Sequence, residues 1–130
     1  MTWPVVYYRA PDGTQPVNGF LEALSDRDYA VLENQLERLG LFGPQLPFPY
    51  SSQVEGELRE LRCHLGKRHI RFLYRRSDNL FVLLHAFEKS SKTVPEADKN
   101  AARGRWADFK ARMEADPRVP PRAAGPTSST

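Results

Sequence analysis

Residues 80–87, with the sequence LFVLLHAF, constrain the fold more than any other stretch because all but one of their positions are apolar. Successive side chains of a strand point to opposite faces of a sheet. A strand that is apolar at both sets of positions needs a cover on both faces and neighbours at both edges. The segment therefore predicts a central strand rather than an edge strand.

Two further strands are predicted just before it, over residues 58–65 and 69–76, with Gly66 and Lys67 as the turn between them. A second turn, SDN, leads into residues 80–87, so the three strands form an antiparallel meander. Residues 69–76 alternate in character, with Ile70, Phe72 and Tyr74 on one face and His69, Arg71 and Arg75 on the other. We expect the first face to pack in the core and the second to meet solvent.

The N-terminal half predicts one strand, two helices and a loop. Residues 5–9, VVYYR, are β-branched and aromatic and stop at the turn signal APDG, which favours a strand. Apolar residues recur at helical spacing over residues 17–24 and 29–39, and Ser25 is placed to cap the second helix. Residues 41–56 hold three prolines and no clean period, which predicts a loop.

A third helix is predicted over residues 95–113, where Ala102, Trp106, Phe109 and Met113 recur at helical spacing. The predicted fold is α+β, with two N-terminal helices packed on a small antiparallel sheet and one C-terminal helix. Residues 1–115 are expected to form one domain. Residues 116–130, rich in Pro, Ala, Ser and Thr, are expected to form a flexible tail.

Several classes of protein are excluded by simple counts. No apolar run approaches the ~18 residues that span a bilayer, and the N-terminus lacks the pattern of a secretory signal. The single cysteine, Cys63, cannot form an intramolecular disulfide, which fits a reducing compartment. We therefore expect a cytoplasmic protein without a membrane partner.

The charge of the chain is concentrated in residues 56–76. This stretch has seven Arg and Lys residues against two Glu residues, whereas the whole chain carries a formal net charge of only +3. A local cationic field concentrates polyanions, and nucleic acid is the commonest polyanion that proteins bind. An ordinary solvated strand face with protected sheet edges would show the same pattern.

Cleavage of RNA without a metal needs a base, an acid and cations that stabilise the charged phosphate. His64, His69 and His85 can transfer protons, and His85 is expected on the same strand face as Phe81, Leu83 and Phe87. The alternative for each histidine is a surface or packed residue without such a role. An anion pocket is a second expectation, formed by Arg62, Arg71, Lys89 and Lys92.

A metal site is a competing interpretation, because Cys63, His64, His69 and His85 can converge. The spacing argues against it, since no pair matches a zinc-finger or H-E-x-x-H pattern. No cofactor motif for phosphates or dinucleotides occurs either. We expect a protein without a cofactor or a metal.

The segments GELRELR, HIRFLYRR and LFVLLHAFEKSSKTVP, followed by the helix EADKNAARGRWADF, resemble a known family. In their order and distances they are similar to the phage-derived HigB-like branch of the RelE/ParE toxin superfamily. The similarity covers about residues 3–113 and includes the short first helix, VNGFLEAL.

The resemblance implies a RelE-like fold and a toxin of a type II toxin-antitoxin module that cuts mRNA in the ribosomal A site. It also implies an antitoxin partner, often a helix-turn-helix protein, besides the ribosome and mRNA. The family's basic positions carry over to Arg59, Arg62, Arg71 and Lys89.

The leading hypothesis is a metal-independent endoribonuclease. Arg71 and Lys89 are expected to bind the scissile phosphate with Arg62 and Lys92 in support, and His85 is the candidate for proton transfer. The residues expected to bind the remaining RNA are Arg59, Lys67, Arg68, Arg75 and Lys92. Two alternatives stay open: a non-catalytic ParE-like inhibitor of DNA gyrase, and a non-toxic module that binds RNA or a protein partner.

Overall fold

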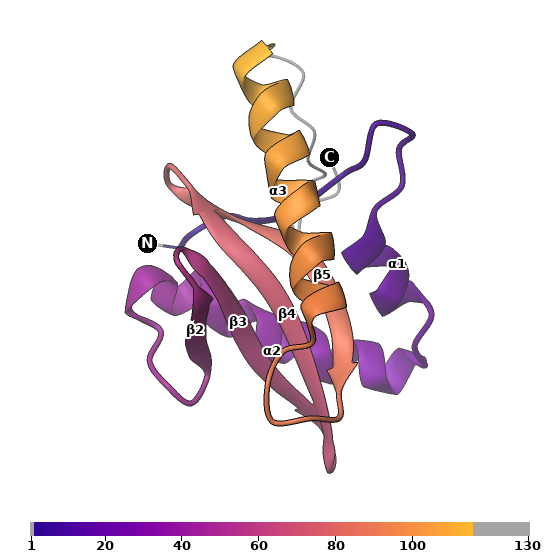
Figure 1. The fold of residues 1–130 in the computed structure, drawn as a ribbon. Coiled ribbons are helices and arrows are strands. Elements are labelled where there is room, and N and C mark those ends of the chain that lie inside the picture. The colour runs from indigo at the N-terminus through magenta and orange to yellow at the C-terminus, as the bar shows by residue number, and fades with distance from the viewer. Residues whose placement is uncertain (1, 116–130) are drawn as a thin grey trace.

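The computed structural model describes residues 2–115, which form three layers with the sheet in the middle (Figure 1). In chain order the elements are β1 (Val5–Tyr7), α1 (Pro16–Glu22), α2 (Asp26–Phe42), the 3-10 turn η1 (Gly43–Gln45), β2 (Ser51–Glu55), β3 (Leu58–Leu65), β4 (Arg68–Ser77), β5 (Leu80–Lys89) and α3 (Glu96–Ala115). The tail predicted over residues 116–130 lies outside the described residues. Among residues 2–115, no helix combines the length and hydrophobicity that a membrane crossing needs.

The sheet has five strands in the order β1-β5-β4-β3-β2. Strands β2 to β5 are antiparallel, whereas β1 runs parallel to β5 and pairs Val5 with Phe81 and Tyr7 with Leu83. The predicted α+β class and the central position of β5 are confirmed. The prediction of a purely antiparallel sheet is wrong, because the N-terminal strand returns beside β5 and makes the sheet mixed.

Strand β2 lies in the stretch that was expected to be a loop, so that part of the prediction is also wrong. Its sequence, SSQVE, shows no apolar alternation, and only Ser51 is buried, at 1% exposure. Hydrogen bonding to β3, with Ser51 opposite Leu61, forms the strand instead. The Ser51 hydroxyl also lies 2.6 Å from the Tyr74 hydroxyl, which anchors this edge to the core.

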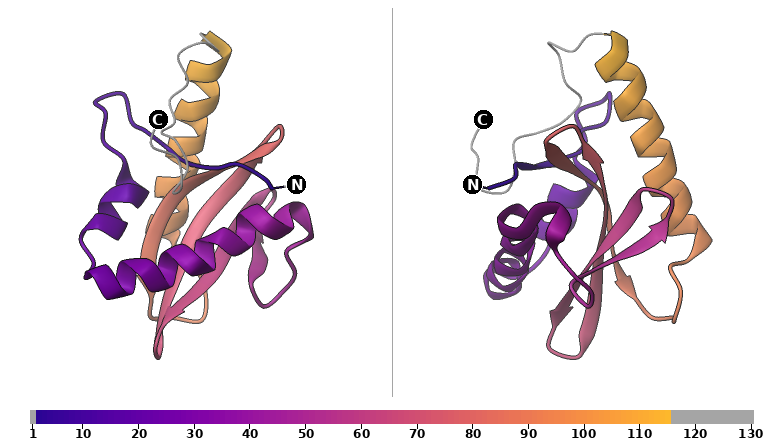
Figure 2. Two further views of the ribbon diagram at one scale, coloured as in Figure 1. Left: turned by 180° about the vertical axis from the view of Figure 1, so that it is seen from behind. Right: turned by 90° about the vertical axis from the view of Figure 1, so that its left-hand side faces the viewer.

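Each face of the sheet has its own hydrophobic core. Helices α1 and α2 cover one face (Figure 2), where the core includes Val17, Leu36, Leu61, Phe72 and Leu83. Helix α3 covers the other, where the core includes Leu58, Leu73, Val82, Leu84 and Phe109. Strand β5 contributes to both cores, as its two-sided apolar sequence predicts.

The start of α2 follows the predicted cap. Ser25 has an extended backbone, and its hydroxyl accepts a hydrogen bond from the Asp28 N–H at 3.1 Å. The contact satisfies one of the N–H groups that the first turn of a helix leaves without an intrahelical partner. It fixes where α2 begins and so how its apolar stripe meets the sheet.

A β-bulge in β5 changes the face to which His85 points. Leu73 pairs with His85 and Tyr74 pairs with Leu83, so Leu84 is an extra residue on β5. Leu83 faces α1 and α2, whereas His85 faces α3, and its ring stacks on Phe87 at 5.6 Å. The expectation that His85 shares a face with Phe81 and Leu83 is therefore wrong, and only Phe87 remains its neighbour.

Candidate nucleic-acid interface

The α3-facing side of the sheet carries a row of basic residues beyond the end of the helix. Strand pairing aligns His64 with His69 and His69 with Lys89, and Arg62 lies two residues before His64 on the same face. His64 and His69 are exposed, and Arg62 and Lys89 are partly exposed. We call these four residues, from three adjacent strands, the cationic strip.

Two cations of the strip keep their charge available. Within residues 2–115 no carboxylate lies close enough to Arg62 or Lys89 to form an ion pair. The backbone N–H of Arg62 donates to the Tyr50 carbonyl at 2.8 Å, which fixes the start of the strip against the chain before β2. Cations that no carboxylate neutralises, on an open sheet face, are suited to binding phosphate.

Arg71 lies directly opposite Arg62 on the same face of the sheet but is buried. It is 4% exposed, and its Nε lies 2.8 Å from Oε1 of Glu60, which is 5% exposed. Burial lowers the pKa of Arg71, as does the nearby charge of Arg62, and Glu60 opposes this shift. The predicted face of Arg71 is confirmed, but the expectation that it meets solvent is wrong because Glu60 pairs with it inside the protein.

His85 joins β5 to α3. Its Nε2 lies 2.6 Å from Oδ1 of Asp98, and its Nδ1 lies 2.8 Å from a guanidinium nitrogen of Arg105. Because a guanidinium can only donate, Nδ1 accepts and the proton sits on Nε2, from which it is donated to Asp98. Both ring nitrogens are thus engaged in holding α3 to the sheet.

Two of the residues predicted to bind RNA lie on the opposite face. Arg59 donates from Nε to the Ser51 hydroxyl at 3.1 Å, beside Tyr74 of the α2-side core. Arg68 forms an ion pair with Glu88 at 2.9 Å. The structure therefore does not bring Arg59 and Arg68 together with Arg62 and Lys89.

Lys67 and Lys92 lie in loops at the same end of the sheet as the strip. Lys67 is exposed in the turn between β3 and β4, directly after the strand that carries His64. Lys92 is exposed in the loop between β5 and α3, three residues after Lys89. Both positions extend the positive charge beyond the strip.

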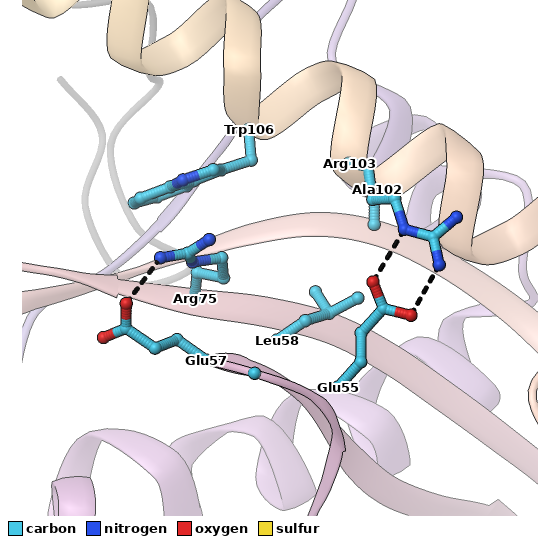
Figure 3. Close-up of a pocket in the computed structure, with 8 residues that line it drawn as sticks. Glu55, Glu57, Leu58, Arg75, Ala102, Arg103 and Trp106 are labelled. Atoms are coloured by element: carbon cyan, nitrogen blue, oxygen red, sulfur yellow. Dashed lines mark hydrogen bonds and ion pairs between the residues drawn. The ribbon is translucent and has the colours of Figure 1, made fainter.

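Arg75 occupies a pocket of about 280 Å³ between α3 and the turn that joins β2 to β3 (Figure 3). Its guanidinium lies 4.3 Å from the Trp106 ring centroid and 2.9 Å from Glu57. A second pair, Arg103 with Glu55 at 2.5 Å, closes the other side. Arg75 lies four positions after Arg71, the residue opposite Arg62, which is roughly 13 Å along β4, so this predicted RNA contact is held apart from the strip.

The residues considered for a metal site are divided between the two faces. Cys63 is buried toward α2, and burial raises the pKa of its thiol to about 12. His64 and His69 lie on the other face, with ring centroids 6.0 Å apart, and His85 is held by α3. Across residues 2–115, no three His, Cys, Asp or Glu side chains gather as a metal site would require.

The sequence analysis did not single out Phe48 and Tyr50. They lie just before β2 and are 70% and 41% exposed. The Arg62 guanidinium lies 5.3 Å from the centroid of the Phe48 ring, and that of Arg38 lies 4.3 Å from that of Tyr50. Their signal in the sequence is a pair of aromatic residues among prolines in an aperiodic stretch, which by itself predicts only a loop.

Comparison with protein families gives a match over most of the chain. The family model described as phage-derived Gp49-like protein matches residues 19–107, which run from α1 into α3 and include the whole cationic strip. A comparison with curated proteins found no match.

Proposed function

The chain belongs to the family of phage-derived Gp49-like proteins, a family of RelE-like, toxin-like proteins, and on that premise we propose that it is a HigB-like toxin that cleaves mRNA. In this proposal it acts in the ribosomal A site as the toxin of a type II module. A cognate antitoxin, with a helix-turn-helix domain, holds it inactive.

The observation that carries the proposal is the cationic strip. Arg62 and Lys89 have no carboxylate partner among residues 2–115, and the strand register fixes their relative positions. Arg62 on β3 and Lys89 on β5 lie on either side of β4, so roughly 10 Å of sheet separates their strands, a distance that a short stretch of RNA backbone can span. The strip is thus suited to hold the RNA backbone while sequence selection comes from other contacts.

The reaction we propose is an attack of the 2′-hydroxyl on the adjacent phosphate. One imidazole of the strip, His64 or His69, takes the proton of the 2′-hydroxyl as the O2′–P bond forms. The other, protonated, gives its proton to the 5′-oxygen as the P–O5′ bond breaks, leaving a 2′,3′-cyclic phosphate and a 5′-hydroxyl. Arg62 and Lys89 stabilise the charge on the phosphate in the transition state, and the step needs no metal.

Arg71 and His85 have different parts in this proposal from those that the sequence suggested. Arg71 is paired with Glu60, and its positive charge balances that of the buried carboxylate beside the strip. His85 positions α3 through Asp98. The proton transfers therefore pass to the two exposed histidines, which lie on the same open surface as Arg62 and Lys89.

Primer extension on mRNA from a cell-free translation reaction tests the proposal. Wild-type protein should produce ribosome-dependent 5′ ends, and Arg62→Ala and Lys89→Ala should each reduce them by about tenfold or more. Lys110→Ala is the matched control, because Lys110 is an exposed cation of α3 whose ammonium lies 5.9 Å from the Trp106 ring centroid and is not part of the strip. Intact mRNA with wild-type protein would overturn the proposal, and a block of replication in growing cells would then favour a gyrase inhibitor.

A further inference from the structure

The segment between η1 and β2 exposes two aromatic side chains. Phe48 is 70% exposed and Tyr50 is 41% exposed, whereas Phe72 and Phe109 in the two cores are fully buried. A phenylalanine this exposed gains almost nothing for the fold from burial. Its position therefore calls for an explanation other than core packing.

Both rings lie beside an arginine. The Arg62 guanidinium is 5.3 Å from the centroid of Phe48, and the Arg38 guanidinium is 4.3 Å from that of Tyr50. An aromatic ring next to a planar cation forms a surface on which unpaired nucleobases stack, since every base has a π-face. A surface built only for an apolar protein partner has no need of these two cations.

The aromatic segment continues directly into the cationic strip. Arg62 belongs to both, because its side chain contacts Phe48 while its backbone N–H donates to the Tyr50 carbonyl at 2.8 Å. The segment is also held in shape, since the N–H groups of Tyr50 and Ser51 both donate to the Pro47 carbonyl, at 2.9 and 3.1 Å. The rings are thus presented on a structured turn rather than on a loose loop.

We propose that Phe48 and Tyr50 form a base-stacking site for single-stranded RNA whose phosphates lie on the cationic strip. The inference rests on the proposed function and adds to it the contact that holds the bases next to the bound backbone. Stacking is tolerant of sequence, so the site would align an unpaired strand across the edge of β3 without selecting particular bases.

Fluorescence anisotropy with two labelled RNA probes tests the site in the full-length protein. One probe is an oligoadenylate of about 12 nucleotides, and the other is an abasic oligoribonucleotide of the same length, which keeps the phosphates and lacks the bases. Phe48→Ala should weaken binding of oligoadenylate roughly five- to tenfold and leave binding of the abasic probe unchanged. Phe48→Trp should restore the affinity, because it restores a stacking ring.

Phe42 provides the matched control. It is 55% exposed, but among residues 2–115 no cation stacks on its ring. Phe42→Ala should therefore bind both probes like the wild type. Arg62→Ala should weaken binding of both probes and reduce the dependence of the affinity on salt, because it removes a phosphate contact.

The outcomes separate this inference from the proposed function. Unchanged oligoadenylate binding by Phe48→Ala, with weaker binding by Arg62→Ala, would overturn the stacking site and leave the RNA-binding strip intact. Wild-type affinity of Arg62→Ala and Lys89→Ala for both probes would instead overturn the strip. If Phe48→Ala binds RNA normally but no longer retains a co-expressed antitoxin, the aromatic segment is a protein interface and the stacking inference is wrong.

Discussion

Replacing Arg71 by methionine should destabilise the fold by about 3 kcal/mol, because Glu60 would remain as a buried carboxylate without its counter-charge. Glu60 and Arg71 are 5% and 4% exposed, and the atoms that pair them are 2.8 Å apart. Removal of one partner of such a pair costs about 3 to 5 kcal/mol. We place the loss at the lower end because the Ser52 hydroxyl still donates to Glu60 at 3.1 Å.

The matched double variant removes both charges. Arg71→Met combined with Glu60→Leu leaves no buried ion, so its stability should lie within about 1 to 2 kcal/mol of the wild type. The remaining loss reflects the Ser52 hydroxyl, which no longer has an acceptor. The two substitutions should therefore show a coupling energy of at least about 2 kcal/mol in a double-mutant cycle.

Urea unfolding monitored by circular dichroism measures all four proteins, and a thermal scan gives a second readout. A loss of 3 kcal/mol corresponds to a fall in Tm of roughly 10 to 15 °C for a domain of this size. If the losses of the two single variants simply add, or if Arg71→Met stays within about 1 kcal/mol of the wild type, the interpretation of Arg71 as a buried structural cation is refuted. A folded double variant that still binds RNA would show that the strip works without the Arg71 charge.

Three smaller predictions concern other parts of the fold. Gly43→Ala should lower stability by about 1 to 3 kcal/mol in urea unfolding, because Gly43 has φ of +58° and a Cβ would lie 2.6 Å from the Trp3 ring. Cys63 should resist alkylation by iodoacetamide at pH 8 in the native protein and react quickly in denaturant, since burial raises the pKa of its thiol to about 12. Burial raises the pKa of Asp108, but hydrogen bonds from Arg112 and Tyr8 lower it by more, so the pKa lies below its ordinary value. The ionised Asp108 therefore stabilises the fold at pH values above about 4, and this stabilisation is lost as the pH falls further and the carboxylate is protonated. Asp108→Asn should make the free energy of unfolding depend less on pH in this acidic range, as measured by urea unfolding at several pH values.

Local patterns were sufficient to predict most elements of the fold. Helical periodicity located α1, α2 and α3, and alternation located β3 and β4, because these elements bury one continuous stripe or face. Strand β2 was missed because backbone pairing with β3, rather than its own side chains, holds it in the sheet. The parallel pairing of β1 with β5 was missed because it joins residues more than 70 positions apart, which no local pattern records.

The candidate site was predictable only in part, for the same reason. Alternation placed Arg71 on the correct face, but its burial depends on Glu60, which only the register of β3 against β4 brings close. One extra residue in β5 moved His85 to the side of α3, and period-two counting cannot detect a bulge. The approach of Phe48 to Arg62 depends on how the chain turns before β2, so the aromatic part of the surface could not be foreseen.

The pairing of β1 with β5 has a consequence for how the chain reaches this fold. Residues 5–7 are synthesised before the other strands of the sheet, whereas their partners, residues 81–83, emerge only after β2, β3 and β4. Until β1 pairs with it, β5, which is apolar on both faces, has an open edge of the kind that promotes aggregation. We therefore expect loss of the first few residues to act chiefly on folding yield, because it exposes an edge that the finished protein hides.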